Sequence, residues 1–120
     1  MEKKKGKEYN YDGQLIYNGE YLNGKKWNGN GYDENGNIIY TLNKGNGKVK
    51  EYDNGNLIFE GEYLNGKRNG KGKEYYFNGE LKFEGEYLNG KIWNGKGKEY
   101  NYKGELIYEG EYLNGKRNGK

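Results

Sequence analysis

The chain has 120 residues, of which 23 are glycine, 15 are tyrosine and 19 are asparagine. Proline, cysteine, histidine, alanine and serine are absent, and hydrophobic residues make up 31%, against roughly 45–50% in ordinary globular domains. The net charge is +3 although 32% of the residues are charged, so this balance by itself indicates neither nucleic-acid nor membrane binding. Disulfide and thiol chemistry are excluded, and the commonest general base of enzymes is missing.

Low hydrophobicity is typical of disordered chains, but such chains are poor in aromatic residues. Here 17% of the residues are aromatic and recur at fixed positions. We therefore expect a folded domain whose apolar contacts are mostly tyrosine rings. The opening Met-Glu-Lys-Lys-Lys is not followed by the apolar run of a secretory signal. No stretch approaches the ~20 apolar residues of a membrane span, and we expect a cytoplasmic protein.

The motif Glu-Tyr-Leu-Asn-Gly-Lys occurs four times, starting at Glu20, Glu62, Glu86 and Glu111. The later copies are spaced by roughly 24 residues, which lies in the range of repeat architectures. We predict a single repeat domain over residues 1–120 with about five units.

The first unit opens with an extended segment over residues 3–11, and a second follows at 15–22. The second unit is degenerate at 29–47: it keeps a shortened strand at 38–42 but lacks the Glu-Tyr-Leu-Asn-Gly-Lys motif.

The last three units, at 48–68, 69–93 and 94–117, are near copies of one another.

Each unit contains runs in which apolar and charged residues alternate. Leu81, Phe83 and Tyr87 are apolar, and the residues between them include Lys82, Glu84 and Glu86. Alternation bounded by Asn-Gly is a strong signal for antiparallel hairpins, whereas frequent glycine and asparagine disfavour a helix. We predict an all-β fold: a single-layer antiparallel β-hairpin ribbon of about ten short strands in meander order.

The segment Tyr108-Glu109-Gly110-Glu111-Tyr112-Leu113-Asn114-Gly115-Lys116 resembles the MORN repeat, named for membrane occupation and recognition nexus. Residues 75–91 are similar to the MORN-repeat variant common in bacteria. The resemblance implies a non-catalytic array that scaffolds proteins, dimerises or binds acidic phospholipids. The bacterial variant further implies an antitoxin or immunity partner.

Catalysis is not expected from the residues. Paired carboxylates such as Glu84 and Glu86 alternate with apolar residues and should point away from one exposed face, whereas a catalytic pair needs an apolar pocket around one carboxyl. Gly70-Lys71-Gly72 lacks the following helix that a phosphate loop requires, and no calcium-loop pattern appears. We predict no catalytic residue, no metal site and no cofactor.

Two groups of residues are candidates for binding a partner. Tryptophan is enriched at binding hot spots, although the two tryptophans are explained equally well as packing residues. A basic edge could bind an acidic protein or lipid headgroup, although solvated turns are the alternative. The aromatic candidates are Trp27, Trp93, Tyr21, Tyr63, Tyr87 and Tyr112, and the basic-edge candidates are Lys25, Lys67, Arg68, Lys91, Lys116 and Arg117.

The function predicted from the sequence is a non-catalytic protein-binding module that blocks or sequesters its partner, as an antitoxin, immunity protein or inhibitor does. The alternatives are a membrane-surface tether for acidic phospholipids and a scaffold fragment of a longer array. Nucleic acid is not expected, because glutamates share the strands with the tyrosines and would repel phosphate. Self-association remains open.

Overall fold

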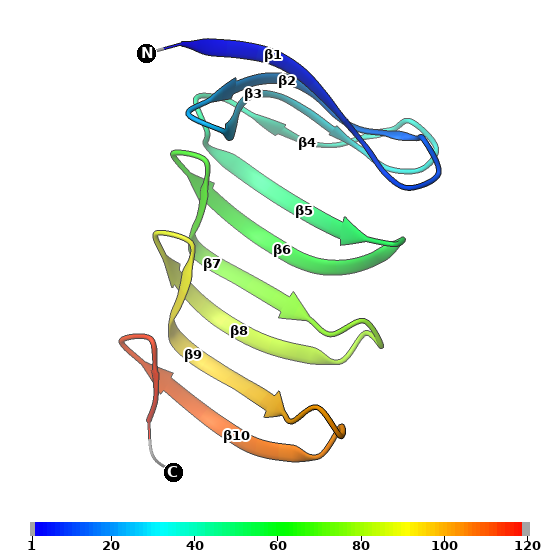
Figure 1. Ribbon diagram of the computed structural model, residues 1–120. Coiled ribbons are helices and arrows are strands. Elements are labelled where there is room, and N and C mark those ends of the chain that lie inside the picture. Colours follow the sequence, from blue (N-terminus) through cyan, green and yellow to red (C-terminus); the bar gives the residue numbers. More distant parts are fainter. Residues whose placement is uncertain (1, 119–120) are drawn as a thin grey trace.

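The computed structural model describes residues 2–118, which form antiparallel strands joined by turns (Figure 1). This confirms the predicted all-β hairpin fold. The strands are β1 (Lys3–Tyr9), β2 (Leu15–Leu22), β3 (Lys25–Tyr32), β4 (Ile38–Leu42), β5 (Gly47–Asp53), β6 (Asn56–Leu64), β7 (Lys67–Tyr75), β8 (Leu81–Leu88), β9 (Lys91–Tyr100), β10 (Leu106–Leu113) and β11 (Lys116–Arg117).

The strands pair in chain order but form two sheets, β1-β2-β3-β4 and β5 to β11. The break falls in the degenerate unit, where only a bridge between Asn43 and Asn46 links the end of β4 to the start of β5. In the later units, the Glu-Tyr-Leu-Asn-Gly-Lys motif supplies the end of the first strand, the turn and the first lysine of the next strand. Its absence leaves a tight turn in place of a continuous ladder.

The core of the larger sheet is a ladder of aromatic rings. Successive rings meet edge to face with centroids 5.3–6.1 Å apart, the favoured geometry for aromatic pairs. Phe59 and Phe83 are fully buried and Tyr87 is 3% exposed. The ladder runs in the order Tyr63, Phe59, Tyr87, Phe83, Tyr112 and Tyr108.

Glycine on the neighbouring strand makes room for these rings. A Cβ added at Gly72 would lie 2.9 Å from a ring atom of Phe59 and 3.0 Å from one of Tyr87. The rings therefore lie directly on the glycine backbone, where a larger residue would have to displace them.

A second core joins the two sheets: Tyr17, Tyr40 and Leu42 of the smaller sheet pack with Val49 of β5. Val49 stands where the sequence pattern of the later units has Gly72.

The strands also bend near the turns that join β6 to β7 and β8 to β9 (Figure 1). Register shifts mark the bends, for example between Glu86 and Tyr87 of β8. At the bend of β7, the guanidinium of Arg68 lies 4.2 Å from the centroid of the Phe59 ring. Side chains of the same sheet, such as Arg68, thus cover the rings.

Candidate functional site

One edge of the ribbon is built from stacked turns that carry lysines, here called the lysine edge. In the Asn89-Gly90 turn both residues have positive φ, 49° and 89°, which suits a two-residue hairpin. The edge consists of the turns at 22–25, 43–46, 64–67, 88–91 and 113–116.

Hydrogen bonds connect the last four of these turns to the preceding unit. The Gly90 amide donates to the Arg68 carbonyl at 2.8 Å, and the Asn89 amide donates to Oδ1 of Asn69 at 3.0 Å. The same pair of bonds recurs for the turn at 114–115, with Trp93 and Asn94 as acceptors. Two backbone amides of each of these turns thus bond to the preceding repeat.

The two tryptophans predicted as binding residues belong to this stacking. Trp27 and Trp93 are half-buried and lie at the bulges of β3 and β9. The carbonyl of Trp93 accepts the Gly115 amide at 2.8 Å, and its ring lies beside that glycine. The carbonyl of Trp27 likewise accepts the Gly45 amide, and the Trp27 ring lies beside Gly45. Both rings therefore support the following turn.

The four candidate tyrosines lie on the core face. Tyr87 is buried, and Tyr21, Tyr63 and Tyr112 are half-buried. The Tyr87 hydroxyl donates to Glu74 at 2.8 Å. Burial, followed by the nearby Glu74 carboxylate, raises the Tyr87 pKa far above its usual range.

Tyr63 and Tyr112 make equivalent bonds to Glu51 and Glu99. Burial raises the pKa of both tyrosines as well. These hydroxyl groups are therefore already hydrogen-bonded within the domain.

The two arginines of the predicted basic edge are ion-paired. Arg68 is half-buried and contacts carboxylate oxygens of Glu51 at 3.1 Å and Glu74 at 3.4 Å. Arg117 is more exposed but binds Glu99 through two nitrogens. Hydrogen bonds from Arg117 and Tyr112 lower the Glu99 pKa to about 2. The free positive charge of this edge therefore comes from its lysines.

Lysines do form a row along the edge, because Lys67, Lys91 and Lys116 are exposed and Lys25 is half-buried. Each is the cross-strand partner of a leucine, and Leu64, Leu88 and Leu113 are also exposed. The degenerate unit adds Lys44. The structure thus brings the predicted lysines together but separates them from the arginines.

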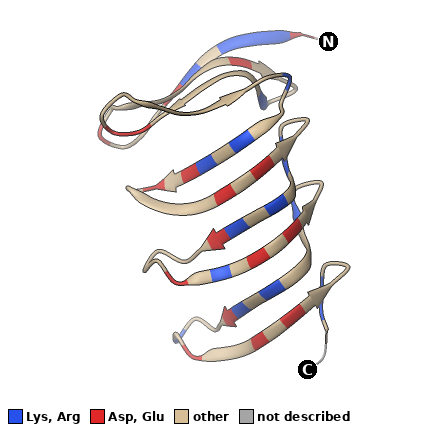
Figure 2. Cartoon of the chain, turned by 180° about the vertical axis from the view of Figure 1, so that it is seen from behind, with Lys and Arg blue, Asp and Glu red and all other residues tan. Residues whose placement is uncertain are grey.

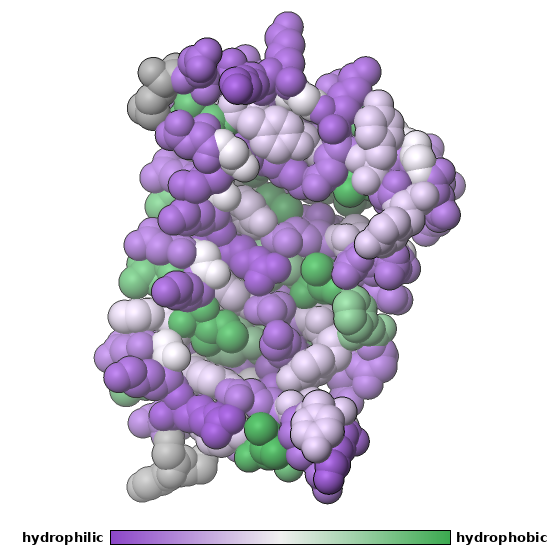
Figure 3. Space-filling view, in the orientation of Figure 1, coloured by the Kyte–Doolittle hydropathy of each residue, from purple (hydrophilic) through white to green (hydrophobic). Residues whose placement is uncertain are grey.

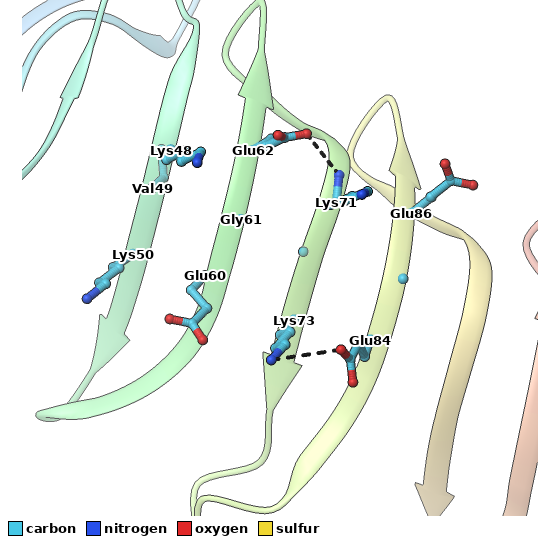
Figure 4. Close-up of a pocket in the computed structure, with 12 residues that line it drawn as sticks. Lys48, Val49, Lys50, Glu60, Gly61, Glu62, Lys71, Lys73, Glu84 and Glu86 are labelled. Carbon is cyan, nitrogen blue, oxygen red and sulfur yellow. Dashed lines mark hydrogen bonds and ion pairs between the residues drawn. The ribbon is translucent and has the colours of Figure 1, made fainter.

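A groove crosses the face opposite the rings (Figure 4). It has a volume of about 620 Å³, and its floor is the backbone of Val49, Gly61, Gly72 and Gly85. Lysines of β5 and β7 alternate with glutamates of β6 and β8 along its walls, and Lys73 pairs with Glu84 at 3.8 Å. No charged side chain among residues 2–118 is buried, so the groove offers no desolvated acid of the kind that acid catalysis uses.

The opposite edge of the ribbon exposes aromatic rings, which sequence reasoning missed as candidates. Tyr11, Phe77 and Tyr102 are 91%, 65% and 93% exposed. We call this the aromatic edge; it consists of the turns at 10–14, 33–37, 53–56, 76–80 and 101–105. In Figure 3 it lies at the right, where aromatic rings project beyond the polar surface. The signal in the sequence was the placement of these residues within the turns rather than in the alternating runs.

The turns of the aromatic edge are held in place by local bonds. Oδ1 of Asn101 accepts the amides of Lys103 and Glu105, which fixes the backbone around Tyr102. Behind the turns, Tyr76 and Tyr100 meet edge to face at 5.2 Å. The exposed rings are therefore presented from an ordered frame.

Charge also distinguishes the two edges (Figure 2). Lysine is the only charged residue type in the turns of the lysine edge. The turns of the aromatic edge contain one lysine, Lys103, and six acids: Asp12, Asp33, Glu34, Asp53, Glu80 and Glu105. Lys103 lies over the Tyr102 ring with its Nζ 5.8 Å from the centroid, so this ring already contacts a cation.

Comparison with known proteins supports the resemblance to the MORN repeat. The family model of this repeat matches residues 59–80 and 108–120. No curated protein and no solved structure matches the chain. MORN repeats are generally non-catalytic modules that bind proteins or membrane lipids.

Among residues 2–118, no group of three or more acidic side chains could hold a metal ion. The described part of the chain also has no helix of the length and apolarity needed to span a bilayer.

Proposed function

We propose that this chain is a non-catalytic module that binds a partner protein through its aromatic edge. The observation that carries the proposal is the exposure of Tyr11, Phe77 and Tyr102, which are the most exposed aromatic side chains among residues 2–118. Burying such rings on binding would yield more free energy than any other side chains on this surface, since aromatic anchors dominate interface energies.

The partner would present a basic segment. Six acids lie in the turns of this edge, and cations are attracted to the faces of aromatic rings, as the contact between Lys103 and the Tyr102 ring illustrates within the chain. Complementary charge would steer the encounter, and the rings would hold the complex. A basic segment seated along this edge would be blocked from its own targets, which is how an antitoxin, immunity protein or inhibitor acts in the cytoplasm.

The test compares three forms of the protein as bait in lysate of the source organism. The first is the wild type, the second carries Tyr11→Ala, Phe77→Ala and Tyr102→Ala, and the third carries Lys67→Glu, Lys91→Glu and Lys116→Glu. The proposal predicts a captured protein that the second bait loses and the third retains, and that rebinds the wild type when both are pure.

Circular dichroism must first show that all three baits are folded. Capture that persists on the second bait, or that only the third bait loses, would overturn the proposal.

A membrane tether is the second candidate, because exposed leucines pair with lysines along the lysine edge. Each basic residue near an anionic bilayer contributes about 1 kcal/mol, and an apolar neighbour can add insertion. If this were the role, the wild type would bind phosphatidylserine vesicles and release them at high salt. The lysine-edge variant would not bind at all.

A further inference from the structure

Several hairpin turns of the chain consist of an asparagine followed by a glycine, both with positive φ. One of them begins with Asn23, which has an interaction within the chain. In the other four turns the asparagine φ is 50°, 53°, 49° and 52°, at Asn54, Asn65, Asn89 and Asn114. All four asparagines are exposed, so access of water does not distinguish them. The turn of Asn54 belongs to the aromatic edge, and the other three belong to the lysine edge.

Hydrogen bonds hold the three turns of the lysine edge in place. The amides of Gly66, Gly90 and Gly115 donate to backbone carbonyls of the preceding unit at 2.8–2.9 Å. The amide of the asparagine before each glycine donates to Oδ1 of another asparagine at 3.0 Å. Opening one of these turns therefore breaks two bonds to the preceding unit.

The turn of Asn54 has neither bond. Within residues 2–118, the Gly55 amide and the Asn54 side chain have no hydrogen-bond partner. Two other Asn-Gly turns of the aromatic edge differ from it, because the amides of Gly36 and Gly79 donate to carbonyls of their own turns at 3.1 and 2.9 Å. The turn of Asn54 is therefore less restrained than the turns of either edge with which it is compared.

We propose that Asn54 is a self-modification site, which converts to aspartate and isoaspartate faster than the asparagines of the three lysine-edge turns. In the first step, the Gly55 amide nitrogen gives its proton to water and attacks Cγ of Asn54. A carbon–nitrogen bond forms, and the bond from Cγ to the side-chain nitrogen breaks. That nitrogen takes up a proton from water and leaves as ammonia. The product is a cyclic imide, and the step needs no oxidant and no cofactor.

Water then opens the imide at one of its two carbonyl carbons. Cleavage of the bond from Cγ to the Gly55 nitrogen gives aspartate at position 54. Cleavage at the main-chain carbonyl gives isoaspartate, in which the chain continues through the side-chain carbon. Both products carry a carboxylate where the amide was neutral. Isoaspartate also lengthens the main chain within a two-residue turn, whose geometry depends on that length.

Hydrogen bonds at the turn control this reaction because the glycine amide has to lose its proton and reach Cγ. An amide that donates to a carbonyl of the preceding unit can do neither until the turn opens. Local opening of this kind costs more free energy where more bonds must break. Since the dipeptide and its backbone are the same in the four turns, the bonds to the preceding unit should set the order of the rates.

The modification changes the charge of the aromatic edge. The new carboxylate lies beside Asp53, in a set of turns that already contains six acids and one lysine. If the proposed function holds, a basic partner would then be attracted more strongly. The reaction itself involves no partner and does not depend on that function.

Peptide mapping by mass spectrometry follows the reaction in the full chain at mildly alkaline pH. Asn54 and Asn65 lie in one tryptic peptide, residues 51–67, so they share digestion and detection, and fragment ions assign the mass change to one of them. Asn65, Asn89 and Asn114 should react at least about tenfold more slowly than Asn54, because two hydrogen bonds must break first. In urea the four rates should converge, since the folded turns are then lost.

A substitution at the lysine edge tests the cause. Asn69→Ala removes the acceptor for the Asn89 amide, so it should speed the modification of Asn89 about fivefold and leave that of Asn54 unchanged. Asn94→Ala is the matched control, because it removes the acceptor for the Asn114 amide and should leave the rate at Asn89 unchanged. Circular dichroism shows that both variants are folded.

Equal rates for Asn54 and Asn65 in the folded protein would overturn the proposal. A rate at Asn54 that exceeds the others by the same factor in urea would also overturn it, because the local sequence and not the missing bonds would then be the cause. The triple alanine variant of the aromatic edge should modify Asn54 at the wild-type rate, so this proposal and the proposed function fail independently.

Discussion

The lysine edge and the aromatic edge close the same hairpins, yet their side chains are used differently. On the lysine edge, amides of each turn bond to the unit before, through acceptors such as Arg68 and Asn69. On the aromatic edge, Asn101 and its equivalents satisfy their own turns, and the rings of Tyr11 and Tyr102 touch little else. The first edge holds the repeats together, and the second leaves its apolar groups available.

The turns of both edges recur with the same spacing. Whether a side chain in a turn is exposed therefore depends on the edge to which the turn belongs, which the repeat period does not reveal. The difference between the edges also predicts a separation of effects. Substitutions that remove the hydrogen bonds between the lysine-edge turns and the preceding units should change stability, and substitutions of the rings at the aromatic edge should change binding.

The largest loss of stability is expected for a substitution in the aromatic core, which lies between the two edges. Tyr87→Ala removes a buried ring that contacts both Phe59 and Phe83, and it should lower the free energy of unfolding by about 3 kcal/mol. Glu86→Ala, on the opposite face, should stay within about 0.5 kcal/mol. Urea denaturation measures both, and similar losses for the two variants would show that the faces are assigned wrongly.

Alkaline pH should destabilise the core more gradually. Burial raises the pKa of Tyr17 to about 12 and places those of Tyr63 and Tyr87 higher still. In the unfolded chain tyrosine titrates near about 10. Above that pH the unfolded state loses protons that the folded state keeps, so stability is complete below pH ~10 and falls as the pH rises toward the folded values.

Urea titrations at several pH values from about 8 to 11 measure this slope, to which each shifted tyrosine adds up to about 1.4 kcal/mol per pH unit. Tyr87→Phe should flatten it. A stability that does not change over this range would contradict the burial of these hydroxyls.

A smaller loss is expected at the lysine edge. Asn69→Ala and Asn94→Ala each remove the acceptor for a turn amide of the next unit, at a cost of about 1 kcal/mol. Lys91→Ala, in the same row of turns but exposed, serves as the control and should change little. Asparagine variants as stable as the lysine control would mean that the stacked turns contribute nothing.

The smallest effect on stability is expected at the aromatic edge. Phe77→Ala and Tyr102→Ala remove exposed rings, so each should shift the free energy of unfolding by less than about 0.5 kcal/mol. Thermal unfolding provides the measurement. A clear loss of stability would place these rings in packing rather than in binding.

The sequence alone predicted the hairpins, the Asn-Gly turns and the aromatic rows, because period-two alternation and positive-φ residues are local signals. Residues such as Glu84 and Phe83 were assigned correctly to opposite faces. The split into two sheets was missed, since a degenerate unit does not reveal whether its strands still pair.

The candidate site was harder to predict, because the bend of the strands is a tertiary feature. That bend carries Arg68 over Phe59 and between two carboxylates, and turns Trp93 beneath the next turn. From the sequence both looked available to a partner. The exposed rings of Phe77 and Tyr102 looked like ordinary turn residues, because nothing local shows that a turn has no neighbour to pack against.

The most direct test of the central claim is the affinity of the captured partner for two matched variants. Tyr102→Ala and Lys116→Ala both remove an exposed side chain from the fifth unit, one at each edge. By titration calorimetry at moderate salt, Tyr102→Ala should weaken binding by about 2 kcal/mol, or roughly 30-fold. Lys116→Ala should leave the Kd almost unchanged. The opposite order, with the lysine variant losing affinity and the tyrosine variant keeping it, would contradict the assignment of function to the aromatic edge.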